Sequence, residues 1–398
     1  MQRTLRILVT GGGTGGHTVP ALATIAAIQK LIAETYTDIA PRFLYVGSAQ
    51  GLEATLAAEA KIGFVSIATG KLRRSANPLR MLNKANLRDA ARVPLGFLQA
   101  LKIVKNFNPD IVFSTGGYVS VPSVFAAGVL GCPVLMHEQT VQIGLANRLC
   151  AKIASRIALS YPESANELGP VERKKAFVTG GVVRKIVVGG DACRGRERYG
   201  FDGDLDAYPV VYVTGGAQGS SIINNSVLDG LNELVVQCCV IHQCGKQKGN
   251  GPQDETKLRA AAQQLPFLLR KRYVATQFVG DEIGDVYAAS SIVVGRSGAG
   301  TVSEVCAVGK PSVFVPLVPT GGDEQTRNAQ RLQSIGAAVI IKQNELSGPV
   351  LVERVTELLA DPEKLMRMGT AAKTMASPNA AELLAKAVID LGLKSQSH

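Results

Sequence analysis

Two glycine-rich segments could bind phosphate groups through their backbone. Residues 11–16 read GGGTGG, follow an apolar stretch and precede a helical pattern, and His17 ends them. Residues 297–301 read SGAGT, occupy the same kind of strand-to-helix junction, and are followed by Glu304. Backbone N–H groups at the N-terminus of a helix suit phosphate oxygens. A carboxylate one turn later could accept both hydroxyls of a ribose. The second segment therefore fits a nucleotide site and, equally, an ordinary helix start with a surface glutamate.

A third segment, PLVPTGGDEQTRNAQRL, could bind a neutral sugar. Its prolines and glycines predict an irregular loop, and Asp323 can cap the helix that follows. Gln325 and Asn328 lie three residues apart and share one face of that helix. Side-chain amides supply both donors and acceptors, which sugar hydroxyls require.

A nicotinamide dinucleotide is a weaker candidate for the first glycine segment. The G-x-G-x-x-G pattern alone is weak, because dinucleotide binding also needs an acid at the end of the next strand. The stretch FLYVGSAQG contains no acid, and the next one, Glu53, falls inside the following helix. A nucleotide-binding oxidoreductase remains an alternative, but the pattern disfavours it.

The cysteines do not form a recognisable metal site. The chain has seven, an odd number, and the only cluster is CCVIHQC at residues 238–244. No zinc-type ligand spacing is met, so small buried cysteines on a core strand are the better interpretation. The cysteines therefore predict no metal site, and no cofactor is expected. With no secretory signal visible, a reducing, cytoplasmic setting is expected.

The surrounding sequence alternates between apolar strands and helical segments, and it does so twice. VTGGGTGG at residues 9–16 parallels VTGGAQGS at 213–220, and residues 114–128 parallel 295–309. Strands that alternate with helices predict parallel, doubly wound sheets. We expect an α/β fold with two Rossmann-like domains, residues 1–180 and 181–378. The last helix, within 379–398, is expected to return to the first domain, and residues 221–235 are expected to form one helix.

Positive charge is concentrated in one part of the chain. The net charge is +11, and residues 71–107 hold nine basic residues against one acid, Asp89. Aliphatic residues are interleaved with these charges, which suits an anionic bilayer surface as well as a solvated helix face. Nucleic acid is not expected, because aromatic residues for base stacking are few. The longest uncharged run, residues 118–136, contains prolines and glycines and predicts a buried helix and strand rather than a membrane span.

Six motifs, in this order, resemble those of one enzyme family: GGGTGGH, TGGYVSVP, HEQ, GGAQGS, RSGAGTVSE and DEQTRNAQ. Together they look like the lipid II-forming glycosyltransferases of family 28, which have the GT-B fold of two Rossmann-like domains with parallel sheets facing across a cleft. The resemblance implies transfer of N-acetylglucosamine from UDP-N-acetylglucosamine to the muramoyl 4-hydroxyl of lipid I, with inversion and without metal. It also implies a peripheral enzyme on the cytoplasmic side of the cell inner membrane. Another GT-B enzyme, a sugar-nucleotide epimerase or a natural-product glycosyltransferase, is the alternative.

The resemblance also assigns substrate contacts. Thr14, Gly15 and Gly16 would contact the diphosphate of the donor or of the acceptor, and Arg184 would contact the donor diphosphate. Val279 would contact the uracil through its backbone, and Gln325 would contact the sugar. The full set of implied substrate-binding positions is Thr14, Gly15, Gly16, Thr140, Arg184, Ala217, Gln218, Val279, Ser297, Ala299, Gly300, Thr301, Val302, Ser303, Glu304 and Gln325. The family often has Asn at 140, Ser at 217, and Gln or His at 324, where this chain has Thr, Ala and Glu.

Two side chains are candidates for the base that an inverting transfer requires. His17 is the first choice, because it ends a glycine loop and histidine titrates in a useful range. Its alternative role is only to hydrogen-bond the acceptor. Glu138, in the HEQ motif, is the second candidate.

Overall fold

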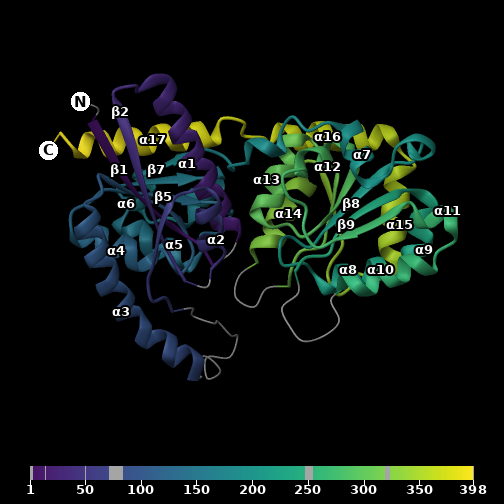
Figure 1. Cartoon of the computed structure of the whole chain (residues 1–398), viewed down its shortest axis with the longest axis horizontal. Coiled ribbons are helices and arrows are strands. Elements are labelled where there is room, and N and C mark those ends of the chain that lie inside the picture. The colour runs from purple at the N-terminus through teal and green to yellow at the C-terminus, as the bar shows by residue number, and fades with distance from the viewer. Residues whose placement is uncertain are drawn as a thin grey trace. The chain divides into compact units, whose positions relative to one another are not determined.

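The computed structural model divides the chain into two compact units, each with its own parallel sheet (Figure 1). Unit 1 comprises Met1–Val183 and Ser377–His398, and unit 2 comprises Arg184–Val318 and Asp323–Ala376. The structure describes residues 3–13, 15–49, 51–70, 84–246, 254–318 and 323–397, and for residues 84–91 it describes the backbone alone. Thr14 and residues 71–83 of the basic stretch therefore lie outside the described residues.

Unit 1 is built on a seven-stranded sheet in the order β3-β2-β1-β4-β5-β6-β7, with all of its strand pairs parallel. The strands are β1 (Arg3–Gly11), β2 (Ile39–Gly47), β3 (Gly63–Ser66), β4 (Ile111–Gly116), β5 (Val134–Glu138), β6 (Arg156–Leu159) and β7 (Ala176–Val178). Their apolar residues face both sides, as in sheets covered by helices on both faces. The carboxyl ends of β1, β4 and β5 lead into the candidate site residues.

The two faces of this sheet are covered by different helices. The helical segments are α1 (Gly15–Thr35), α2 (Leu52–Glu59), α3 (Lys84–Phe107), α4 (Val121–Val129), α5 (Leu145–Ile153), η2 (Pro162–Glu167), α6 (Pro170–Lys174) and α17 (Ala380–Ser395). Ile7 and Val9 of β1 pack with α1 and α17, whereas Leu8 packs on the opposite face with α3, α4 and α5. This alternation follows from the two-residue period of a strand. In Figure 1, α17 (yellow) runs beside α1, so the last helix of the chain is part of unit 1.

Unit 2 repeats this plan with a six-stranded parallel sheet in the order β10-β9-β8-β11-β12-β13. The strands are β8 (Val210–Thr214), β9 (Cys239–Gln243), β10 (Tyr273–Thr276), β11 (Ser290–Gly295), β12 (Ser312–Phe314) and β13 (Ala338–Ile340). Counted from the first strand of each unit, the order 3-2-1-4-5-6 is the same in both. The prediction of two Rossmann-like α/β domains is confirmed.

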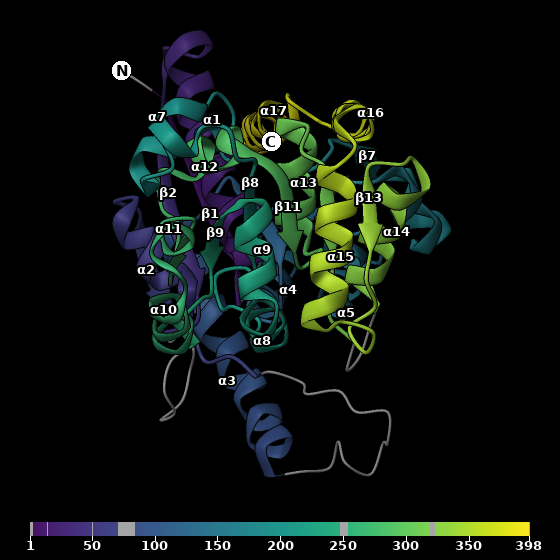
Figure 2. The same ribbon diagram turned by 90° about the vertical axis from the view of Figure 1, so that its right-hand side faces the viewer.

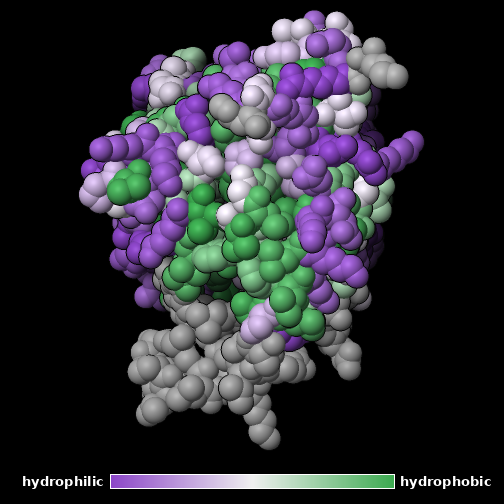
Figure 3. Space-filling view, turned by 90° about the vertical axis from the view of Figure 1, so that its left-hand side faces the viewer, coloured by the Kyte–Doolittle hydropathy of each residue, from purple (hydrophilic) through white to green (hydrophobic). Residues whose placement is uncertain are grey.

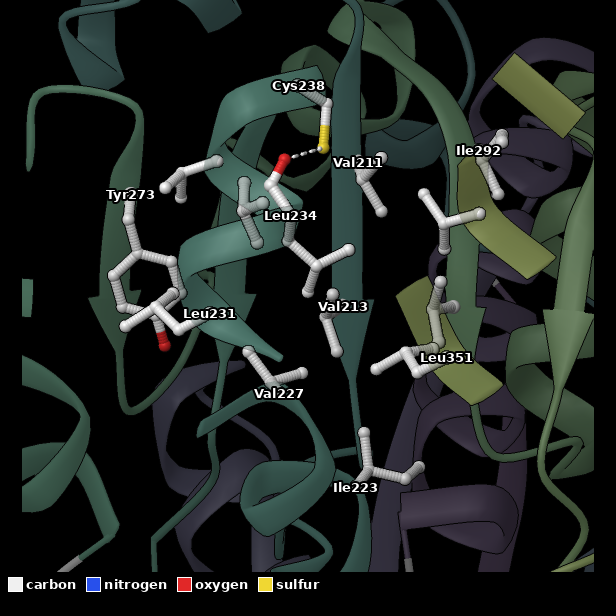
Figure 4. Packing of buried hydrophobic residues seen from close by; sticks show 14 of the residues in the cluster. Val211, Val213, Ile223, Val227, Leu231, Leu234, Cys238, Tyr273, Ile292 and Leu351 are labelled. Atoms are coloured by element: carbon white, nitrogen blue, oxygen red, sulfur yellow. Dashed lines mark hydrogen bonds between the residues drawn. The ribbon is translucent and has the colours of Figure 1, made fainter. Parts of the chain in front are cut away.

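Helices also surround the second sheet. They are η3 (Lys185–Val187), α7 (Ala192–Tyr199), η4 (Gly203–Leu205), α8 (Ser221–Asp229), α9 (Leu231–Gln237), α10 (Asp254–Gln264), α11 (Phe267–Arg270), α12 (Ile283–Ala289), α13 (Ala299–Val308), α14 (Glu324–Ser334), α15 (Gly348–Leu359) and α16 (Pro362–Thr374). Figure 2 shows α8, α9 and α15 gathered on one side of this unit. Figure 4 shows the core beneath them, where Val211 and Val213 of β8 meet Ile223, Leu234 and Leu351.

The structure corrects one detail of the sequence prediction and confirms that the cysteines of residues 238–244 are buried. The expected single helix over residues 221–235 is instead two helices that meet at Gly230, where a Cβ would lie 2.7 Å from Val352 Cγ2 and 3.0 Å from the Gly348 carbonyl oxygen. Close packing of α15 thus requires glycine at this point. The cysteine cluster is buried, and His242 within it binds Tyr273 and Asn224 rather than a metal ligand set. Within the described residues no cluster of metal-ligating side chains occurs.

Candidate functional site

The first glycine loop of unit 1 is supported from below by a buried carboxylate. β1 ends at Gly11 and α1 begins at Gly15, so Gly15 and Gly16 form its first turn. Glu53 is fully buried, and its carboxylate accepts hydrogen bonds from Ser48 N (3.0 Å) and Gly13 N (3.2 Å). A Cβ on Gly12 would lie 2.4 Å from the Glu53 carboxyl carbon. The loop therefore needs glycine to approach this side chain.

His17, in the first turn of α1, has a defined tautomer. Its Nδ1 lies 2.8 Å from the Thr115 carbonyl oxygen and 3.0 Å from Gln139 Oε1. Since both neighbours are hydrogen-bond acceptors, Nδ1 carries a proton. In the neutral ring Nε2 is then the unprotonated nitrogen, available to accept a proton. The two acceptors therefore hold the half-buried imidazole in one orientation.

The groups behind His17 fix this arrangement. Gln139 Nε2 donates to the Thr115 carbonyl (2.8 Å) and to the His137 carbonyl (3.1 Å), so its Oε1 must face His17. His137 is completely buried, and its Nε2 lies 3.1 Å from Ser160 Oγ. Burial and the nearby His17 lower the pKa of His137 to about 3. His137 is thus a neutral, structural member of the HEQ motif.

Glu138, the second candidate base, is buried and engaged by four donors. Its Oε1 accepts from Thr140 N (3.0 Å) and Thr140 Oγ1 (2.8 Å), and its Oε2 accepts from Asn147 Nδ2 (2.9 Å) and Gly144 N (3.3 Å). The Thr140 hydroxyl also lies 2.6 Å from the Gln142 carbonyl oxygen, so its single proton is shared between two internal acceptors. The carboxylate therefore organises the turn over residues 140–144.

The glycine loop of unit 2 is supported by neutral groups instead. It follows β8, and Thr214 Oγ1 accepts a hydrogen bond from Gly216 N (3.0 Å). Gly219 has a φ of +75°, and a Cβ there would lie 2.0 Å from the Cys244 carbonyl oxygen. Ala217 and Gln218, at the tip of this loop, are exposed. The Ala217 carbonyl also accepts a hydrogen bond from Lys246 N (3.4 Å).

Glu304 stands on α13 within a small polar cluster. Its Oε2 accepts from the Tyr287 hydroxyl (2.9 Å), and its Oε1 lies 3.3 Å from Arg184 Nη2. The Tyr287 ring packs edge-on against Tyr212, with centroids 5.6 Å apart. Burial, with Glu304 adding to it, raises the pKa of Tyr287, so its hydroxyl stays protonated and donates. Arg184 and Glu304, chosen separately from the sequence, meet here.

The start of α13 is joined to α14. Ala299, Gly300 and Thr301 form the first turn of α13, and nothing lies within 4 Å of a Cβ built on Gly298 or Gly300. Val302 is buried and Ser303 is half-buried in the next turn. Ser297 is buried, and its hydroxyl donates to the Gln325 carbonyl (2.7 Å). The Gln325 side chain accepts from Leu317 N (3.0 Å), so α14 is held next to this helix start.

Val279 lies in the loop after β10, and its backbone N–H is already engaged. It donates to Gln243 Oε1 at 2.8 Å. If this segment contacts a base, the N–H of Val279 is not available for it in this arrangement.

Sequence reasoning did not single out Gln243, Tyr287, Gln139 or Glu53 as supporting residues. Their partners are distant in the chain, and only the presence of Gln139 in the HEQ motif could have drawn attention to one of them.

Comparison with known proteins places these features in a family. The N-terminal domain model of glycosyltransferase family 28 matches residues 7–159, and the C-terminal domain model matches residues 210–384. The chain is 33% identical over 354 residues to the UDP-N-acetylglucosamine–N-acetylmuramyl-(pentapeptide) pyrophosphoryl-undecaprenol N-acetylglucosamine transferase of Lachnoclostridium phytofermentans, covering 89% of this chain and 90% of that one.

Solved structures agree with this placement. The crystal structure of Acinetobacter baumannii MurG aligns with a TM-score of 0.69 and 26% identity, over 97% of this chain and 99% of that one. A UDP-GlcNAc 2-epimerase of Neisseria meningitidis aligns with a TM-score of 0.65 at 13% identity, over 98% and 100% of the chains, which shows a shared fold alone. The chain therefore belongs to glycosyltransferase family 28, among its UDP-N-acetylglucosamine–N-acetylmuramyl-(pentapeptide) pyrophosphoryl-undecaprenol N-acetylglucosamine transferases.

Proposed function

We propose that this protein transfers N-acetylglucosamine from UDP-N-acetylglucosamine to the muramoyl 4-hydroxyl of lipid I, with inversion, to form lipid II. Unit 2 binds the donor and unit 1 the acceptor. The observation that carries the proposal is the Arg184–Glu304–Tyr287 cluster beside the start of α13, which offers a carboxylate and a cation together. The names of the relatives support the same substrates.

The donor is held by complementary groups of unit 2. Glu304 accepts the two ribose hydroxyls, while Tyr287 keeps the carboxylate in place. Arg184 and the N-terminal turn of α13, including Ala299 to Ser303, face the diphosphate, because a cation and the N-terminus of a helix both favour negative charge. Gln325 addresses the sugar, and the loops at Ala217, Gln218 and Val279 complete the donor contacts. Ser297 acts indirectly, by anchoring α14.

His17 acts as the general base. As the acceptor 4-hydroxyl attacks the anomeric carbon, the bond from that carbon to the UDP oxygen breaks and the hydroxyl proton passes to Nε2. The imidazolium that forms is stabilised by the Thr115 carbonyl and Gln139 Oε1 at its Nδ1–H. Glu138 is assigned a positioning role, since four donors already occupy its oxygens. Thr14, Gly15 and Gly16 are proposed to lie near the acceptor diphosphate.

Positive potential for the departing UDP comes from Arg184 and the start of α13, so no metal ion and no cofactor is included in the proposal. The decisive assay incubates the protein with UDP-N-acetylglucosamine and a lipid I analogue, with and without a chelator, and follows the products by mass spectrometry. We expect one added N-acetylglucosamine and equal rates in both conditions. Epimerised UDP-sugar, or no sugar transfer at all, would refute the proposed reaction.

Membrane attachment is proposed through an apolar surface on unit 1. The α3–α4 patch consists of Val93, Leu95 and Leu98 on α3 with Val129 at the end of α4 and Leu130 directly after it, all of them exposed. The two helices pack together, and Arg92, Lys102 and Lys105 of α3 are exposed as well. Figure 3, which views unit 1, shows hydrophobic residues gathered on this face. Apolar side chains next to cations suit the surface of an anionic bilayer.

This attachment would place the protein on the cytoplasmic side of the cell inner membrane as a peripheral protein, with no role for nucleic acid. None of the described helices combines the length and hydrophobicity needed to cross a bilayer. The basic residues of 71–83, which also prompted the membrane prediction, lie outside the described residues.

Vesicle sedimentation tests this attachment. Leu95→Ser/Leu98→Ser should lower binding to phosphatidylglycerol vesicles about tenfold or more, because two exposed leucines lose their burial in the bilayer. Phe267→Ser/Leu268→Ser on α11 of unit 2 is the matched control, since these side chains are 68% and 72% exposed. Equal vesicle binding by both variants would contradict the assignment to α3 and α4.

A further inference from the structure

Thr115, near the end of β4, contacts His17 at two separate points. Its carbonyl oxygen lies 2.8 Å from the ring nitrogen Nδ1 of His17. Its hydroxyl donates a hydrogen bond to the backbone carbonyl of His17, also at 2.8 Å. Thr115 is completely buried. One residue of β4 thus fixes both the imidazole and the main chain of His17.

A shift in strand register gives Thr115 this position. In the pairing of β1 with β4, Thr10 lies opposite Ser114, and the next pair is Gly11 with Gly116. Thr115 is therefore an extra residue of β4 that the pairing skips, as in a β-bulge. A bulge re-aims the groups of its extra residue, and here the hydroxyl fills the space beside Gly11. A Cβ on Gly11 would collide with Thr115 Oγ1, so glycine at this position admits the hydroxyl.

The first turn of α1, which carries His17, has little support of its own. It begins with Gly15 and Gly16, and glycine has a large backbone freedom and a low helix propensity. Pro20 follows in the second turn and has no N–H, so the Gly16 carbonyl cannot receive the usual helical hydrogen bond from residue 20. A hydrogen bond from outside the helix therefore contributes more to the position of His17 than it would in a regular turn.

The two contacts of Thr115 differ in what they depend on. Its carbonyl accepts from His17 Nδ1 and from Gln139 Nε2, both at 2.8 Å, so both lone pairs of that oxygen are used. This backbone contact orients the ring and is available from any residue at position 115. The contact to the His17 carbonyl requires a side-chain hydroxyl. It is therefore the part of the arrangement that a substitution can remove selectively.

We infer that Thr115 is a positioning residue for the transfer reaction. Its hydroxyl fixes the main chain of His17, and the ring nitrogen Nε2 is thereby held within reach of the acceptor hydroxyl. A general base must lie within hydrogen-bonding distance of the proton that it takes, so a small displacement of its main chain lowers turnover. The inference rests on the proposed function, in which His17 is the base. Thr115 itself is not required to touch a substrate.

Steady-state kinetics with UDP-N-acetylglucosamine and a lipid I analogue test the inference. Thr115→Val keeps the branched shape of the side chain and removes only the hydroxyl. At saturating substrates its kcat should fall about three- to tenfold, the effect of one lost hydrogen bond, while the Kd for UDP stays within about twofold. Thr24→Val is the matched control, because Thr24 is buried in the same helix and its hydroxyl donates to the Pro20 carbonyl at 2.8 Å. This variant should keep kcat within about twofold of wild type.

A double variant separates positioning of His17 from a general structural role. In a His17→Ala background, Thr115→Val should lower kcat by at most about 1.5-fold more, because no imidazole is left to position. A purely structural role would lower kcat by the same factor in both backgrounds. Thr115→Ser retains the hydroxyl and should keep kcat within about twofold of wild type, whereas Thr115→Ala should resemble Thr115→Val. Thermal melting identifies variants that fail to fold, and if Thr115→Val is one of them, the comparison of Ala with Ser decides.

Specific results would overturn the inference. A wild-type kcat in folded Thr115→Val contradicts it, and so does an equal loss in the His17→Ala background or an equal kcat for Thr115→Ala and Thr115→Ser. Wild-type protein that forms no lipid II would refute the proposed function and the inference with it. An active wild type with an unimpaired His17→Ala would refute the base and its positioning. A normal Thr115→Val beside an impaired His17→Ala would refute the role of Thr115 alone.

Discussion

The two units have the same strand order, and each carries a glycine loop after its first strand, but different groups support the two loops. In unit 1 the supporting group is the buried carboxylate of Glu53, which accepts from Gly13 N. In unit 2 it is the neutral amide of Gln243, which donates to the Gly216 carbonyl and is joined by Thr214. One fold thus presents two loops, one supported by a carboxylate and the other by a neutral amide.

This difference teaches why similar loops need not bind similar ligands. The buried Glu53 carboxylate repels an anion close to Gly12 and Gly13, because the protein interior screens charge poorly, so the acceptor diphosphate is assigned to the start of α1 at Gly15 and Gly16 instead. The Gly13 N–H is also already paired with that carboxylate. In unit 2, by contrast, no charged side chain supports the loop. Arg184 is held beside α13 by its ion pair with Glu304. A donor diphosphate is therefore expected in unit 2.

The largest expected effect is on turnover, and it comes from His17 in unit 1. His17→Ala should lower kcat about 10²–10⁴-fold, the usual contribution of a general base, while the Kd for UDP stays within about twofold. Steady-state kinetics and calorimetry on the same preparation check both values. If kcat stays near normal, His17 only binds the acceptor, and unit 1 would lose its proposed catalytic role.

Acid should affect the two units alike, because each contains one buried neutral histidine. Burial lowers the pKa of His137 and of His242 to about 3, against an ordinary value of 6.5. The unfolded chain then binds more protons than the folded chain between these values, so stability is complete above pH 6.5 and falls as pH drops toward 3. Denaturant titrations at several pH values should show a loss of at most about 1.4 kcal/mol per pH unit for each histidine. A stability that stays constant down to pH 4 would contradict this burial.

Replacing the Glu53 carboxylate with a neutral amide tests directly whether the charge beneath the first loop distinguishes the two units. Glu53→Gln should lower the free energy of unfolding by about 1–3 kcal/mol, because Gly13 and Ser48 lose charge-assisted hydrogen bonds. UDP affinity should not change, since the donor is assigned to the other unit. Chemical denaturation and calorimetry measure the two effects. A clear gain in UDP affinity would instead place a nucleotide site next to Glu53.

A smaller effect is expected on the donor side. Glu304→Gln should weaken UDP binding about tenfold, because a neutral amide accepts ribose hydroxyls less strongly than a carboxylate and leaves Arg184 without its partner. Tyr287→Phe serves as a milder comparison, since it removes a single hydrogen bond to Glu304. Calorimetry with UDP gives both values. Unchanged affinity in Glu304→Gln would argue against a ribose contact.

Much of the fold could be predicted from local patterns, and the supporting residues could not. Apolar strands that alternate with helices identified both sheets, and short-range glycine patterns identified both loops. The need for glycine at position 230 was missed, because it comes from the packing of α15, more than 100 residues later. Likewise His17 and Gln139 are 122 residues apart, and Gln243 and Val279 are 36 apart. Hydrogen bonds at such separations leave no periodic trace in the sequence.

The assignment of the donor to unit 2 is tested most directly by hydrogen–deuterium exchange of the whole protein with and without UDP. The account predicts slower exchange in segments 215–219, 277–280 and 297–304, with segments 11–17 and 137–144 unchanged. Protection of segment 11–17 by UDP, without protection in unit 2, would contradict it.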